Sequence, residues 1–177
     1  MPVLTYNAVE HSINGKINGR AKSDVAIIGC PFDLGSTRGA GQREAPAHIR
    51  FIDQWSPESA RSIIYGIDPF DVLDIVDCGD VEFSNGDTLG GWKAIKDKTR
   101  LVYGNVKRAV ILLGGDHSIT AQALSAIAEK EGPLTVFHFD AHPDTWKPDS
   151  GSDLDHGTWV RWALDNGCAN RVIQFGV

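Results

Sequence analysis

Short apolar runs alternate with longer segments of mixed character along most of the chain. The run at 109–113 is apolar at every position, which is typical of a strand buried on both faces of a parallel sheet. Four other runs are short and largely apolar in the same way. We therefore expect five strands, at Val25–Ile28, Val72–Val76, Ala109–Leu113, Leu134–Phe139 and Val172–Phe175.

The segments between these runs predict three helices. Residues 46–52 predict a short helix, because the first of them is a proline, which the first turn of a helix favours. Asp87 or Thr88 can cap a helix that runs to about residue 107, and residues 118–131 predict the third. This alternation of strand and helix predicts a three-layer α/β domain with a mostly parallel sheet.

The length and composition fit one domain. Residues 1–23 are polar and irregular and predict an N-terminal arm, which leaves 24–177 for the domain. The net charge of −6 gives no reason to expect nucleic acid or an anionic membrane as a partner. We see no signal peptide and no apolar stretch of the roughly 20 residues that a membrane helix needs. We therefore expect a cytoplasmic protein.

The cysteines support the same compartment. Cys30, Cys78 and Cys168 are odd in number, far apart and without a Cys-x-x-Cys spacing. A disulfide framework or a thiolate zinc site is therefore not expected. We interpret them as free thiols in a reducing cytoplasm.

The strongest chemical pattern follows the strand predicted at 134–139. Asp140, His142 and Asp144 are spaced two residues apart, so in an extended chain their side chains point to the same side. Two carboxylates and one imidazole suit manganese, iron or zinc better than a thiophilic ion. A solvated loop is the alternative for this motif taken alone.

A second pattern follows the strand predicted at 109–113. His117 comes directly after a Gly-Gly turn, and glycine lets the backbone turn sharply. A helix cap by Asp116 or Ser118 is an alternative, and a phosphate loop is disfavoured because no Gly-Lys-Ser/Thr follows. Because ligands bind at the carboxyl ends of strands in such sheets, His117 can supply a fourth ligand to the same site.

These two motifs resemble the first two metal-binding signatures of the ureohydrolases, the family of arginases, agmatinases and guanidinobutyrases. The similar segments are Gly114–Ser118 and Phe139–Asp144. Gly29–Gly35 and Pro46–Arg50 also resemble the opening of that family, although Ala45 stands where a glycine usually precedes the proline. The resemblance implies an arginase/deacetylase-like fold.

The resemblance also implies roles for individual residues. It implies a site for two manganese ions, Mn2+, in which His117 and Asp144 bind one ion and His142 binds the other. Asp140 would bridge both ions and so take part in catalysis. Asp116 would orient a ligand. His138 shares the strand parity of Asp140, but the family pattern makes it a supporting or core residue.

A third segment bears on the substrate. By the resemblance, His156 transfers a proton to the leaving amine, and an imidazole suits that role near neutral pH. Arginases place an asparagine two positions earlier to hold the substrate carboxylate, and here that position is Leu154. We therefore expect hydrolysis of agmatine to putrescine and urea, a step of polyamine biosynthesis. Guanidinobutyrate and arginine are the alternative guanidino substrates.

Family members carry a later Asp-x-Asp signature and a glutamate that this chain does not contain. Asp153 and Asp155 have that spacing but fall just before His156, so we do not assign them as the missing ligands. We expect a fragment that lacks the C-terminal part of the domain and is inactive alone, with activity and homo-oligomerisation belonging to the complete protein. A short homologue that binds metal without catalysis is the alternative.

Two other classes of protein share part of this pattern or none of its chemistry. Deacetylases share a related architecture and an Asp-x-His signature, but they use one zinc ion and lack the pattern around His117. A scaffold without activity has no need for Asp and His at two strand ends. Metal content separates the three, since two manganese ions, one zinc ion or none are expected respectively.

Overall fold

The computed structural model describes residues 23–55, 61–147 and 153–177. Within these ranges helices and parallel strands alternate, which confirms the predicted α/β class. The predicted arm lies outside the described residues except for Ser23. The elements, in chain order, are β1 (Val25–Cys30), the 3-10 helix η1 (Gln42–Glu44), α1 (Ala45–Trp55), α2 (Pro69–Val72), β2 (Ile75–Asp80), α3 (Thr88–Tyr103), β3 (Ala109–Gly114), α4 (Ile119–Glu131), β4 (Leu134–Phe139), α5 (Trp159–Asp165) and β5 (Ala169–Phe175).

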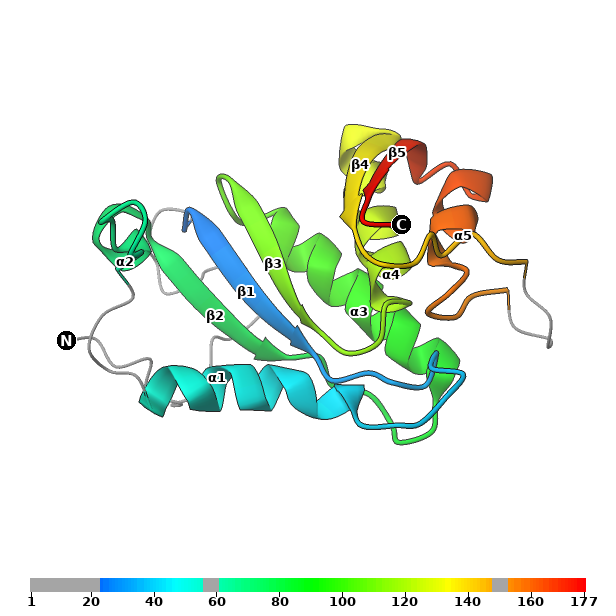
Figure 1. The fold of residues 1–177 in the computed structure, drawn as a ribbon, viewed down its shortest axis with the longest axis horizontal. Coiled ribbons are helices and arrows are strands. Elements are labelled where there is room, and N and C mark those ends of the chain that lie inside the picture. Colours follow the sequence, from blue (N-terminus) through cyan, green and yellow to red (C-terminus); the bar gives the residue numbers. More distant parts are fainter. Residues whose placement is uncertain (1–22, 56–60, 148–152) are drawn as a thin grey trace.

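The strands form two parallel sheets in the described part of the chain. One has the order β2-β1-β3 and the other pairs β4 with β5 (Figure 1). β1 and β3 pair residue for residue, from Val25 opposite Ala109 to Cys30 opposite Gly114. Because the strands are parallel, the loops that follow β1 and β3 leave the sheet at the same edge.

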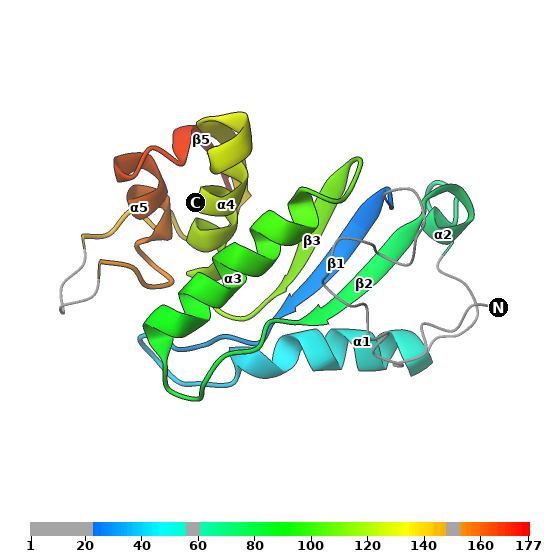
Figure 2. The same cartoon turned by 180° about the vertical axis from the view of Figure 1, so that it is seen from behind.

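The helices bury the apolar side chains that fix these loops. α3 lies across one face of the three-stranded sheet (Figure 2), and α4 packs against α3. Ile28, Phe32, Ile95 and Trp159 are 0–1% exposed and belong to one core cluster. Full burial of a large apolar side chain contributes about 1.5–3 kcal/mol. Phe32 lies just after β1, and Trp159 is the first residue of α5. The core therefore extends under the loops at the sheet edge.

β2 differs most from its prediction, whereas β1 ends two residues later and β5 begins three residues earlier than predicted. β2 begins at Ile75 because Val72 belongs to the one-turn helix α2, which Asp68 caps by accepting a hydrogen bond from the Phe70 backbone N–H. The strand continues into polar residues, Asp77 and Asp80. Both carboxylates form salt bridges with the Arg50 guanidinium, at 2.7 Å for Asp77 and 2.5 Å for Asp80. These charge-assisted hydrogen bonds stabilise the two carboxylates at the sheet edge.

Helix boundaries differ in smaller ways. α3 ends at Tyr103 rather than near residue 107, and the Gly104 N–H closes its last turn on the Arg100 carbonyl. α5 was not predicted from the sequence. Thr158 precedes its first residue and is a common capping residue, but its hydroxyl accepts a hydrogen bond from the Asp155 N–H, and no side-chain hydrogen bond caps the first turn.

The three cysteines form no disulfide, as the sequence predicts. Cys30 lies in the core, where burial raises the pKa of its thiol to about 12. A thiol with so high a pKa is unreactive at neutral pH. Cys30 therefore acts as a small apolar residue.

Among the described residues, no helix combines the length and the apolar character required to cross a lipid bilayer.

The buried carboxylate of Asp33 predicts a loss of stability in acid. The hydrogen bond from Arg43 holds its pKa at about 2, below the ordinary 3.8. A carboxyl with a lowered pKa stabilises the fold above pH 4, and that stabilisation is lost as the pH falls from about 4 to 2. Because Arg43 is 40% exposed and water screens the pair, we expect about 1 kcal/mol. Urea unfolding of the Asp33→Asn variant should show this deficit at pH 7 and little deficit at pH 2.

Candidate metal centre

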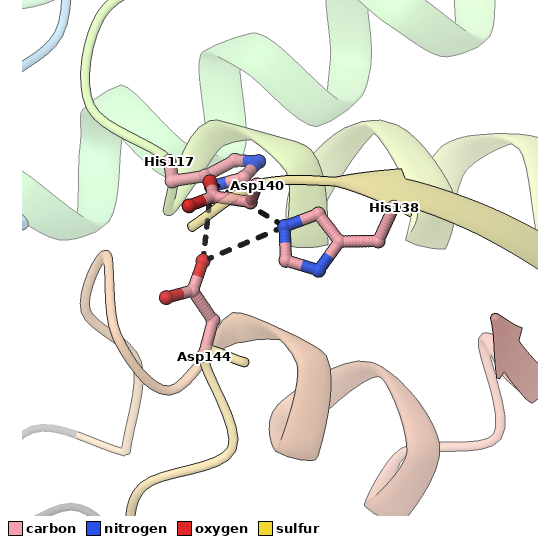
Figure 3. A group of neighbouring side chains, drawn as sticks. All are labelled: His117, His138, Asp140 and Asp144. Carbon is pink, nitrogen blue, oxygen red and sulfur yellow. Dashed lines mark ion pairs between the residues drawn. The ribbon is translucent and has the colours of Figure 1, made fainter. Parts of the chain in front are cut away.

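Four side chains converge where β3 and β4 end (Figure 3). His117 lies in the loop between β3 and α4, His138 lies on β4, and Asp140 and Asp144 follow β4. One ligand atom from each lies within 4.8 Å of the others. Three of the four, His117, Asp140 and Asp144, are the ligands expected from the resemblance, which gives His138 a supporting role.

His117 faces both carboxylates. Its Nδ1 atom lies 2.9 Å from Oδ2 of Asp144 and 3.2 Å from Oδ2 of Asp140. Asp144 is buried and also accepts a hydrogen bond from the Trp159 indole N–H at 2.7 Å. The arrangement offers two carboxylate oxygens and one imidazole nitrogen at a single point, a donor set that suits manganese, iron or zinc.

Asp140 lies between two histidines on opposite sides of its carboxylate. Oδ2 faces His117, whereas Oδ1 accepts a hydrogen bond from the His142 backbone N–H at 2.9 Å. The Nδ1 atom of His142 is 3.3 Å from the same Oδ1 atom. The His142 side chain is 79% exposed and lies outside the four-residue cluster. The structure therefore places His142 beside Asp140 but away from His117.

The surroundings of Asp140 favour its ionised form. Burial raises the pKa of this carboxyl, but the hydrogen bond from the backbone N–H of His142 and the electrostatic effect of the nearby His117 ring outweigh burial and lower the pKa overall. The carboxylate is thus ionised at neutral pH. It is available to a cation without first losing a proton.

Asp144 has an uncommon backbone conformation. Its φ is 50°, and it is the one described non-glycine residue with a positive φ. Its carbonyl accepts from the Val160 N–H, and its carboxylate accepts from Trp159, so the first turn of α5 holds it. Strained residues of this kind concentrate at functional sites.

The loop that carries His117 is fixed to the loop after β1. Gly115 and Asp116 donate backbone hydrogen bonds to the carbonyls of Cys30 and Phe32. A Cβ on Gly115 would lie 2.2 Å from the Phe32 carbonyl oxygen, so only glycine fits. Asp116 lies outside the cluster and is buried, and its burial raises the pKa of its carboxyl.

His156 lies in a second loop that meets the same segment. Its Nδ1 atom and its backbone N–H both lie 3.0 Å from the Gly35 carbonyl oxygen. A carbonyl only accepts hydrogen bonds, so Nδ1 carries the hydrogen and Nε2 is left to exchange a proton. Gly35 in turn donates its N–H to Asp116 at 2.8 Å. The backbone N–H and C=O of Gly35 therefore connect the loops of His117 and His156.

Two further residues of the His156 loop occupy different surroundings. Leu154 is 3% exposed and belongs to the hydrophobic core, whereas Asp153 is exposed. Neither belongs to the metal cluster. Trp159, which touches Asp144, was missed from the sequence because no motif joins residues 15 positions apart.

A family model described as the Arginase family matches residues 23–177. An agmatinase from Chromobacterium violaceum is 37% identical over 157 residues, which cover 87% of this chain and 48% of the relative. The chain thus spans about half the length of the curated relatives it matches.

Solved structures show the same likeness. A hypothetical agmatinase from Burkholderia thailandensis superposes with a TM-score of 0.80 and 35% identity, over 89% of this chain and 50% of that chain. Proclavaminate amidino hydrolase from Streptomyces clavuligerus also reaches 0.80, at 32% identity, over 89% and 52% of the two chains. The fold described above is therefore shared along most of its length.

Proposed function

Because this chain belongs to the arginase family, we propose that the complete protein hydrolyses a guanidino compound at a dinuclear manganese centre, with agmatine as its substrate. The products would be putrescine and urea. The observation that carries the proposal is the position of Asp140, with His117 on one side of its carboxylate and His142 on the other. The activity is assigned to the complete protein, since this chain spans about half the length of its relatives.

The donor set fits a pair of cations. His117 and Asp144 would hold one ion, His142 the other, and Asp140 both. In the described part of the chain, the ion-pair partners of both aspartates are histidines. Two carboxylates this close repel each other unless a cation lies between them. When bound, the ions would supply a nucleophilic water at neutral pH.

The remaining groups of this chain suit a cationic substrate that has no carboxylate. Nε2 of His156 can take up a proton and pass it to the leaving amine, because the Nδ1 hydrogen is held by the Gly35 carbonyl. The buried Leu154 offers no polar group to a substrate carboxylate. A site without a partner for that carboxylate leaves it unpaired, which disfavours arginine relative to agmatine.

Urea release with manganese tests this ranking. The complete protein should release urea from agmatine faster than from arginine or guanidinobutyrate, by about tenfold or more in kcat/KM. The same preparation after treatment with a chelator serves as the control and should be inactive until manganese is restored. Faster release from arginine would contradict the substrate, and release that survives chelation would contradict the metal centre.

A further inference from the structure

His138 is a buried histidine whose role the four-residue cluster leaves open. Its side chain is 3% exposed, and its Nε2 atom makes no hydrogen bond among the described residues. The same atom points toward Oδ2 of Asp140 at 3.5 Å and Oδ2 of Asp144 at 3.9 Å (Figure 3). An unsatisfied buried polar atom is unfavourable. Nε2 must therefore either bind an ion or donate to a carboxylate.

The hydrogen bonds of Gln174 decide between these roles. Its Nε2 atom lies 2.7 Å from the Pro143 carbonyl oxygen and 2.9 Å from Nδ1 of His138. A carbonyl cannot donate, so the amide nitrogen of Gln174 and not its oxygen faces Pro143. The second hydrogen of the same nitrogen then points to His138. Nδ1 of His138 must accept it, and the ring hydrogen is on Nε2.

We propose that His138 is a positioning residue and not a metal ligand, and that its Nε2–H, oriented by Gln174, holds the carboxylate of Asp140 in place. A ring nitrogen that carries a hydrogen has no lone pair for a metal. A shift of a few tenths of an ångström brings it within hydrogen-bond distance of Asp140. This inference rests on the proposed metal centre.

The fold explains how Gln174 reaches this position. β4 and β5 are parallel, and His138 lies directly opposite Gln174 in their register. Paired residues in a sheet point to the same face, so the amide lies beside the ring. β5 thus contributes to the metal centre through a histidine on the neighbouring strand, although none of its own residues belongs to the cluster.

The positioning role has a consequence for metal affinity. Among the described residues, the nearest partner of Asp140 Oδ2 is His117 at 3.2 Å, and that imidazole would itself bind the ion, so it cannot replace the donor that His138 supplies. Asp144 has a donor of its own in Trp159. Loss of His138 should therefore leave the Asp140 carboxylate less well fixed in position than the Asp144 carboxylate. Removing such an outer partner typically weakens metal binding about 10- to 100-fold.

Manganese binding by the complete protein, measured by titration calorimetry, tests the inference. His138→Phe keeps the ring volume and removes both nitrogens, so it should still bind two ions, about 10- to 100-fold more weakly. Gln174→Leu leaves His138 in place and should weaken binding about tenfold. His138→Gln restores a donor and should recover part of the affinity. His48→Gln, at an exposed position on α1, is the matched control and should bind as the unmodified protein does.

Nitrogen-15 NMR of the metal-free protein gives a second readout that a purely structural residue would not move. The His138 ring should carry its hydrogen on Nε2, and Gln174→Leu should redistribute it toward Nδ1. A hydrogen on Nδ1 in the unmodified protein, loss of one ion at saturation in His138→Phe, or unchanged affinity in both variants would overturn the inference. Absence of manganese binding by the unmodified protein would instead overturn the proposed function, and the role of His138 with it.

Discussion

Replacing Asp140 with asparagine in the complete protein is expected to lower manganese-dependent urea release at least about a thousandfold. The substitution keeps the size of the side chain and removes its charge. Asp140 is the residue whose two oxygens face His117 and His142 separately, so both ions would lose a ligand together. A bound metal contributes several kcal/mol to such reactions, and about 4 kcal/mol corresponds to a thousandfold change in rate.

The measurement combines the urea assay with metal analysis of the dialysed protein. The manganese content should fall below two ions per chain in Asp140→Asn. Asp71→Asn is the matched control, because Asp71 is an exposed carboxylate on α2, at the amino end of β2 (Figure 1). The control should keep both the metal and the activity. Retention of two tightly bound ions by Asp140→Asn would show that this residue does not bridge them.

The parts of the site that the sequence predicted are those set by strand ends. His117 and Asp140 follow apolar runs that become β3 and β4, and residues at the carboxyl ends of parallel strands meet at one edge. The two-residue spacing from Asp140 to Asp144 predicts an extended chain. The structure instead brings Asp144 to the cluster with φ at 50°, held by Trp159.

The bounds of β2 could not be predicted from the sequence, because they depend on a partner that is distant in the chain. The polar end of β2 is stabilised by Arg50, which lies 27 and 30 residues before Asp77 and Asp80. Periodicity records only the local alternation of apolar and polar positions, so it placed the strand on the more apolar residues before it.

His138 illustrates the same limit at the site. Strand parity puts it on the same side as Asp140, but parity does not say which nitrogen carries the hydrogen. That depends on Gln174, which lies 36 residues later, and on the carbonyl of Pro143. Only the register of β4 and β5 brings these groups together.

His156→Asn is expected to lower kcat for urea release by about 10²- to 10⁴-fold, the usual contribution of a positioned acid or base. The reason lies in how the imidazole is held. The Gly35 carbonyl accepts from Nδ1–H, so Nε2 is the nitrogen left for the substrate. Asparagine can still donate to that carbonyl and preserve the loop, but it cannot exchange a proton near neutral pH.

Because the loop is preserved, manganese content should be unchanged in His156→Asn, which distinguishes it from the Asp140 variant. Added imidazole should restore part of the rate, since a free base can enter the space that the ring vacates. His48→Gln again serves as the control and should need no rescue. A variant that keeps most of its activity would place the proton donor elsewhere. A variant that loses manganese would instead show that Gly35 and His156 act by holding the loop of His117, because the Gly35 N–H also reaches Asp116.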